Sequence, residues 1–199
     1  SFNAAPYGGA ALVGSTLALI IGVFHMKWCL TFLVALLSFS AHGAWIDGTG
    51  KPIPDTESMR SAGDFGVHIV LTADEDQFRQ TWNSSKTPPK LSTTNTVRLG
   101  ASVSALLLFH GCSPNADGLC DVVAEFILEN PNGEKTPAGG GPVWSGKPMQ
   151  PRLFQLGQAS LTVGFDITDP VGDYKITANI KDKVSGRALS VVSQLKVTK

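Results

Sequence analysis

The sequence has no excess of either charge and few cysteines. Its 199 residues contain 16 Lys and Arg against 16 Asp and Glu, and only 3 Cys. Because no run of Lys or Arg stands out, the chain offers no electrostatic footprint for a polyanion, and we expect no nucleic acid partner. So few cysteines also exclude a mini-protein held together mainly by disulfides. The apolar fraction of 43% instead describes an ordinary folded protein.

Motifs specific enough to name a reaction are missing as well. No Ser stands in a Gly-x-Ser-x-Gly context, and Gly139-Gly140-Gly141 lacks the Lys-Ser/Thr of a phosphate-binding loop. Beyond the first 44 residues, only His68 and His110 are candidate imidazole bases. We therefore expect a protein that is not an enzyme and has no cofactor, and a hydrolase is the least favoured function.

The beginning of the chain has the features of an export leader. Residues 1–44 contain no acidic residue and one basic residue, Lys27, which follows Met26. An apolar run comes next, and Ala41-His42-Gly43 then places small residues before Ala44. This pattern predicts a signal peptide that starts at Met26 and is cleaved near Ala44.

Residues 1–25 repeat the apolar theme without adding charge, which is typical of an upstream reading-frame extension. A membrane hairpin of two short helices is the alternative, but each apolar run is shorter than the ~20 residues needed to cross a bilayer. We expect a periplasmic or secreted protein that meets the membrane only through its export signal.

The rest of the chain divides into an arm and one domain. Residues 44–64 are rich in Gly, Pro, Asp and Ser without an apolar period, which predicts a flexible N-terminal arm. Residues 65–199 show the alternation of apolar and polar positions that is typical of half-buried strands. At least six such segments occur: Val67–Leu71, Val103–Phe109, Val122–Leu128, Leu161–Ile167, Tyr174–Ile180 and Leu189–Val197.

Little else in this domain has a regular period. A capping box of Thr72 and Glu75 predicts one short helix that ends near Trp82. Residues 83–95 are expected to form a loop, and residues 136–151, rich in Gly and Pro, an irregular excursion. Short strands with almost no helix predict an all-β fold, an antiparallel β-sandwich.

The end of the chain carries a resemblance. Asp169-Pro170-Val171-Gly172-Asp173-Tyr174, followed by an alternating strand, a Ser-Gly turn and a last strand, resembles the closing strands of bacterial immunoglobulin-like and macroglobulin-type domains. With Phe109-His110-Gly111-Cys112, Gly118-Leu119-Cys120-Asp121 and Trp144, residues 65–199 also resemble small exported proteins of Gram-negative bacteria that have no known activity. The resemblance implies an immunoglobulin-like β-sandwich in the periplasm.

Two cysteines follow the leader, Cys112 and Cys120, and an even number in an exported chain predicts a disulfide between them. The alternative is a copper or zinc site made by His110, Cys112 and Cys120, because thiolate and imidazole bind both metals. Their spacing matches no established metal-binding pattern, so we expect no metal and favour the disulfide.

Four further predictions concern single side chains. Trp82 and Trp144 are candidate binding residues, with recognition placed in residues 83–95 and 136–151. Tyr174 is expected to be buried with its hydroxyl bonded to the backbone of the Asp169–Gly172 turn, as in a tyrosine corner. His68 falls on the outward phase of its strand and is expected at the surface.

Together these features favour a non-enzymatic periplasmic module that binds an envelope protein or a glycan. The alternative function is a metal-binding or redox accessory protein of the cell envelope that uses His110, Cys112 and Cys120.

Overall fold

The computed structural model describes residues 45–46, 49–84, 90–149 and 153–199, all of which belong to one compact unit. The predicted leader, its start at Met26 and its cleavage near Ala44 lie outside these residues. In the described part, no helix is both long and apolar enough to span a membrane.

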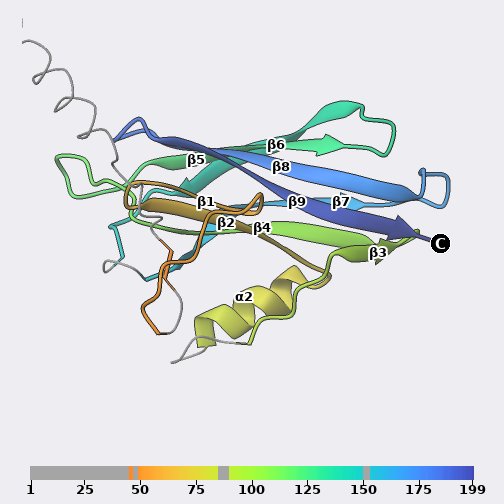
Figure 1. The fold of residues 1–199 in the computed structure, drawn as a ribbon, viewed down its shortest axis with the longest axis horizontal. Helices are drawn as coiled ribbons and strands as arrows, with labels where there is room; N and C mark the ends of the chain where they lie inside the picture. The colour runs from red at the N-terminus through yellow and green to blue at the C-terminus, as the bar shows by residue number, and fades with distance from the viewer. Residues whose placement is uncertain (1–44, 47–48, 85–89, 150–152) are drawn as a thin grey trace, which may run out of the picture. The chain divides into compact units, whose positions relative to one another are not determined.

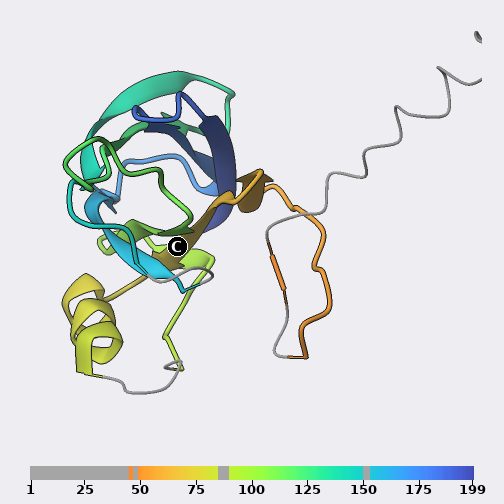
Figure 2. The same cartoon turned by 90° about the vertical axis from the view of Figure 1, so that its left-hand side faces the viewer.

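Two sheets pack face to face in the described part of the chain (Figures 1 and 2). The first sheet has the order β1 (Met59–Ala62), β2 (Phe65–Thr72), β4 (Ser102–His110), β7 (Gln155–Gly164). The second has the order β3 (Thr96–Arg98), β9 (Ala188–Thr198), β8 (Gly172–Asp182), β5 (Val122–Glu129), β6 (Lys135–Trp144). Neighbouring strands are antiparallel, except for β3 and β9, which are parallel.

The strand order is that of an immunoglobulin-like sandwich. In one sheet β2, β4 and β7 take the places of strands A, B and E, and in the other β5, β8 and β9 take those of C, F and G. The chain crosses from one sheet to the other between β4 and β5, between β6 and β7 and between β7 and β8, as in a Greek key. The predicted fold class, an immunoglobulin-like β-sandwich with one short helix, is confirmed.

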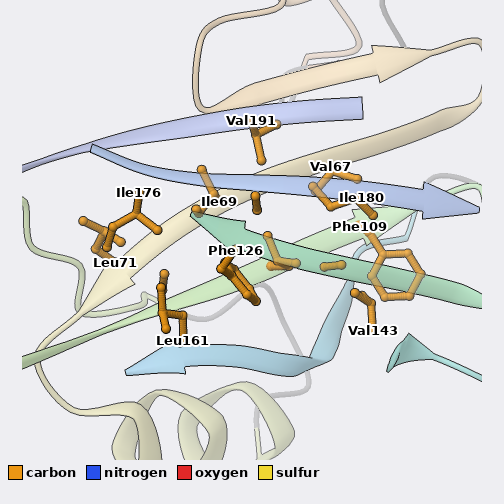
Figure 3. Packing of buried hydrophobic residues seen from close by; sticks show 14 of the residues in the cluster. Val67, Ile69, Leu71, Phe109, Phe126, Val143, Leu161, Ile176, Ile180 and Val191 are labelled. Carbon is orange, nitrogen blue, oxygen red and sulfur yellow. The ribbon is translucent and has the colours of Figure 1, made fainter. Parts of the chain in front are cut away.

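The core lies between the sheets and uses the alternating apolar positions of both. Figure 3 shows Ile69 and Phe109 from the first sheet, with Phe126 and Val191 from the second, among the side chains that meet there. All four side chains are at most 2% exposed. At these four positions the period of two in the sequence therefore predicts the core face of the strand correctly.

Helix α2 (Glu75–Ser84) covers the outer face of the first sheet (Figure 2). Phe78 of the helix packs there against Leu106, Leu108 and Leu156, so that β4 is buried on both faces. The predicted capping box is wrong in detail: Asp74 is the N-cap, and its carboxylate accepts a hydrogen bond from the Gln77 amide at 2.9 Å. Thr72 still belongs to β2, which places it too early to cap the helix.

Residues 136–151 do not form the irregular excursion that the sequence predicted. Most of it is β6, an edge strand that pairs with β5. Prolines are tolerated in an edge strand because one side of that strand faces solvent, where a missing N–H group removes no hydrogen bond between strands. A side chain at Gly140 would clash with the Ala124 carbonyl, so glycine permits the close approach of β6 to β5. Gly139, Gly140 and Gly141 thus belong to a paired strand.

Two further boundaries differ from the sequence prediction. Strand β7 runs from Gln155 to Gly164, whereas Ile167, expected within it, is 82% exposed beyond its end. The arm expected to be flexible contains strand β1, which pairs with β2. It also contains Trp45, which is only 3% exposed. Short segments docked on a sheet by pairing and one aromatic side chain carry no periodic pattern, so the sequence does not reveal them.

Candidate functional site

Three connections gather at one end of the sandwich, toward the left in Figure 1. They are residues 111–121 between β4 and β5, the described residues 145–149 and 153–154 between β6 and β7, and residues 183–187 between β8 and β9. We call this set the loop end. Hydrogen bonds connect its members, and a disulfide closes the first of them.

The first connection is closed by the disulfide between Cys112 and Cys120, whose Cα atoms are 6.0 Å apart. Inside it the Asn115 side-chain oxygen accepts hydrogen bonds from the amides of Asp117 and Leu119, at 2.9 and 3.0 Å. The predicted disulfide is therefore confirmed. Both sulfurs are bonded to each other, so the alternative metal site of His110, Cys112 and Cys120 has no thiolate in this structure.

Asp182 joins the first connection to the third. Its carboxylate is fully buried and accepts hydrogen bonds from the Ser113 amide (2.9 Å), the Val184 amide (3.1 Å) and the Ser185 hydroxyl (2.6 Å). Burial alone would raise the pKa of Asp182, but these donors, led by Ser185, lower it overall. A buried, ionised carboxylate thus holds two loops together.

Asp182 was not predicted as a functional or structural residue. The signal was present, because an aspartate three residues before Ser185, in a Ser-Gly turn, is typical of side-chain-capped turns. Its bond to Ser113 spans 69 residues, however, and no local pattern indicates such a partner.

Two more links complete the loop end. The Lys183 amide donates to the Asp121 carbonyl at 2.8 Å, and the Lys183 ammonium lies 3.3 Å from the Asp121 carboxylate. The Cys120 amide donates to the Gly146 carbonyl at 2.9 Å. The disulfide loop is therefore tied to both of the other connections.

The loop end exposes apolar side chains. Six of the large apolar residues that are 37% to 49% exposed belong to the loop end or to the neighbouring arm: Ile46, Leu119, Met149, Leu153, Phe154 and Val184. Ile167 and Val171, exposed between β7 and β8, lie on a different connection. Exposed apolar side chains gathered in this way are typical of interaction surfaces.

An aromatic cluster adjoins the loop end. The Trp45 ring stacks on Phe154 with centroids 5.4 Å apart, and it meets His110 and His68 edge to face at 5.1 and 6.4 Å. Burial lowers the pKa of both histidines; for His110 it outweighs the opposing effects of the Asp64 backbone and charge. His68 lies on the outward face of β2 as expected, but Trp45 of the arm packs against it and leaves it only partly exposed.

The two candidate binding tryptophans lie in different places. Trp144, at the end of β6, is half-buried: its ring lies 6.1 Å from Phe109 and its indole N–H donates to the Lys147 carbonyl at 3.0 Å. Trp82 packs from α2 onto the small cluster under the helix. The structure therefore gives each tryptophan packing contacts and does not bring the two together. Their role in binding stays a prediction.

Tyr174 has the geometry of a tyrosine corner. Its side chain is 4% exposed, and its hydroxyl donates to the Pro170 carbonyl at 2.9 Å. In the same turn the Asp169 carboxylate accepts from the Asp166 amide at 2.7 Å, and Gly172 has a φ of 142°, which favours glycine. This corner lies on the connection between β7 and β8, apart from the loop end.

The fold and the braced loops define an immunoglobulin-like β-sandwich domain. No family model and no curated protein matches the sequence. Solved structures with some similarity include the sporulation control protein Spo0M of Bacillus subtilis, at 10% identity and a TM-score of 0.41 over 69% of this chain and 51% of that one. A Niemann-Pick type C2 protein from the Japanese carpenter ant matches at 9% identity and a TM-score of 0.35, over 65% and 89%.

A third similar structure is the CARDB domain of the PF1109 protein from Pyrococcus furiosus, in complex with di-metal ions. It is 10% identical, with a TM-score of 0.39, over 73% of this chain and 99% of that one. This chain spans about half the length of Spo0M. These scores are too low to carry a functional argument.

Proposed function

We propose that the protein is a non-enzymatic binding module that recognises another protein through its loop end. One observation carries this proposal: a buried carboxylate and backbone hydrogen bonds lock three connections to one another, and a disulfide closes the first of them, yet the connections expose apolar side chains. Binding orders loops and side chains at a free-energy cost, and loops that are already fixed avoid most of it. In variable immunoglobulin domains the loops of one end serve recognition in the same way.

The chemistry of the loop end favours a protein partner over a glycan. The exposed side chains are aliphatic or aromatic, including Leu119, Leu153 and Phe154. Its buried or looped polar groups are already engaged, since Asp182 and Asn115 accept hydrogen bonds within the loops. A polar ligand needs free, oriented hydrogen-bonding groups, whereas a protein interface is built around apolar anchors.

Two observations support further parts of this proposal. The first concerns the absence of an enzymatic role, and the second concerns the cellular compartment. The imidazoles of His68 and His110, the bases considered above, lie against Trp45 in a covered position. The disulfide is compatible with an oxidising compartment, which agrees with a periplasmic or secreted protein exported by the predicted signal peptide.

The test is capture of partners by tagged protein variants from the periplasm. The double variant Leu119→Ser with Leu153→Ser should reduce recovery of the partner at least tenfold, because it removes two exposed anchors. Both side chains are solvent-exposed, so the melting temperature should change little. The matched control is Ile167→Ser, which is 82% exposed on another connection and should leave recovery unchanged.

Equal recovery with the double variant and the parent would contradict the loop-end site. Equal loss with Ile167→Ser would show that capture depends on general surface hydrophobicity, which would also contradict it.

A further inference from the structure

Three rings at the margin of the loop end surround the indole of Trp45. Phe154, on the connection between β6 and β7, stacks on it with centroids 5.4 Å apart and planes at 17°. His110 of β4 meets it edge to face at 5.1 Å, and His68 of β2 does so at 6.4 Å. His110 and Phe154 lie 5.5 Å from each other. Rings attract at centroid distances of about 4.5 to 7 Å, so His68, His110 and Phe154, which we call the ring site, together bind one aromatic side chain.

The first sheet makes room for the ring site. Gly66 lies opposite His110 in the register of β2 and β4, and a side chain at Gly66 would occupy the place of the His110 ring. The imidazole of His110 therefore lies across the outer face of β2, the face that His68 shares with Gly66. The indole of Trp45 is enclosed there and is only 3% exposed.

Trp45 belongs to an arm that is closed on itself and anchored a few residues later. The Ile53 amide donates to the Trp45 carbonyl at 3.0 Å, which closes the arm. The Asp55 carboxylate accepts hydrogen bonds from the Ser61 amide and hydroxyl, at 3.0 and 2.9 Å, which fixes the chain to β1. If Trp45 leaves the ring site, this anchor keeps it close, at a high effective concentration.

Two features indicate that another ring can replace this indole. Its N–H is buried and has no hydrogen-bond partner in the part of the chain that the structure describes. Such a donor destabilises the docked arm, because water would bond to it after release. In addition, Phe154 stacks on Trp45 and is still 41% exposed among the apolar side chains of the loop end. A partner bound to the loop end therefore reaches a wall of the ring site.

We propose that the ring site binds an exposed aromatic side chain of the protein partner, and that Trp45 fills the site until that side chain displaces it. The seated indole identifies the chemistry that fits: a planar ring that stacks on Phe154 and meets the two imidazoles edge to face. This inference rests on the proposed loop-end function, because Phe154 belongs to both sites. It adds regulation, since the arm competes with the partner and weakens its apparent affinity by the fraction of molecules whose ring site is open.

The test measures whether the full chain binds an indole from another molecule. The probe is a synthetic peptide with the sequence of residues 45–54, in which fluorotryptophan replaces the tryptophan, and fluorine NMR follows its binding. Trp45→Ala empties the ring site and should bind the peptide at least tenfold more tightly than the parent does. Trp45→Phe should bind it as weakly as the parent, because a phenyl ring still fills the site.

Two double variants locate the bound peptide. Phe154→Ser added to Trp45→Ala removes the stacking ring and should weaken binding about tenfold. Ile167→Ser added to Trp45→Ala is the matched control on another connection and should leave binding unchanged. Circular dichroism checks that each variant is folded. If Trp45→Ala unfolds, Ile53→Pro decides the case, because it removes the amide that closes the arm and should strengthen peptide binding relative to the parent.

Peptide binding that is absent from every variant, equal in the parent and Trp45→Ala, or unchanged by Phe154→Ser would overturn the proposal. A dimer of the parent that Trp45→Ala dissociates in analytical ultracentrifugation would also overturn it, because the ring site would then serve a second copy of the chain. The peptide experiment needs no partner. Failure of peptide binding while the Leu119 and Leu153 double variant still loses its partner would refute the ring site alone and leave the loop-end function standing.

Discussion

A single buried carboxylate, Asp182, connects two loops that are far apart in the sequence. Its donors are three backbone amides and one hydroxyl group at 2.6 to 3.4 Å, so nearly all of its hydrogen-bonding capacity is used. Bonds to a charged group contribute more than bonds between neutral groups. The shape of the loop end therefore depends on Asp182.

We predict that Asp182→Asn lowers the free energy of unfolding by about 2 kcal/mol at pH 7, because one charged acceptor becomes a weaker neutral one. The folded-state pKa of Asp182 is lowered, so its stabilising effect is complete above about pH 4 and is lost as the pH falls through the folded-state pKa. The difference between parent and variant should therefore shrink below about pH 4. Urea unfolding from pH 7 to pH 3 measures it.

The control for this prediction is Asp117→Asn, an exposed carboxylate in the same region. It should change the free energy of unfolding by less than about 0.5 kcal/mol. A stability difference for Asp182→Asn that stays constant down to pH 3 would show that the charge of Asp182 does not stabilise the fold.

Tyr174 offers a second test on one atom. Tyr174→Phe removes the hydroxyl that donates to the Pro170 carbonyl and leaves the ring against Phe165, 5.1 Å away. The variant should be about 1 kcal/mol less stable in thermal or urea unfolding. A variant as stable as the parent would mean that water replaces the hydroxyl group without loss.

The disulfide stabilises the connection between β4 and β5 as a unit. Replacing Cys112 and Cys120 together by Ser should lower the free energy of unfolding by roughly 2.5 kcal/mol, from the loop-length relation. The sandwich should still form, because its core lies between the sheets. Thermal unfolding gives the change in stability. A double variant that fails to fold would show that the fold itself depends on this connection.

Helix α2 protects the edge of the first sheet. Arg79 donates to the carbonyls of Gly157 and Gln158 in β7, at 3.0 and 3.3 Å, and pairs with Glu75 at 2.8 Å. Glu75 also accepts from the Ser160 hydroxyl at 2.8 Å. These contacts occupy backbone groups that an exposed edge strand would offer to another chain.

Strands in which apolar and polar residues alternate could be predicted from the sequence. A strand whose residues are acceptable only at the edge of a sheet could not. Val122 to Leu128 and Tyr174 to Ile180 show a clear period of two and lie in strands β5 and β8. In β6 the glycines and prolines hide the strand, because only its place at the sheet edge makes them acceptable. The glycines and prolines by themselves indicate a turn and do not reveal that the segment lies at a sheet edge.

The candidate site was predicted in part for a similar reason. The disulfide followed from the number and setting of the cysteines, and residues 145–149 are the part of the expected recognition segment that lies at the loop end. The covering of His68 by Trp45 was not predictable, since it brings an aperiodic arm onto the face of β2. Long-range contacts of this kind leave no periodic trace in the sequence.

The molecule as a whole closes around its last strand. Strand β9 lies between β3 and β8, and the Val192 and Lys196 amides donate to the carbonyls of Glu57 and Asn95, at 2.7 and 2.8 Å. Three segments from the first half of the chain thus contact β9, the last strand. They are the stretch before β1, the stretch before β3, and β3 itself.

This position of β9 sets the order of events during synthesis. A growing polypeptide that has not yet reached residue 188 lacks the strand between β3 and β8, and its core lacks Val191, Leu195 and Val197. The sandwich cannot close before these residues emerge, and pairing between distant segments is slow even then. A chain without its last strand therefore lacks the complete core, which is compatible with the export before folding that we propose for this protein.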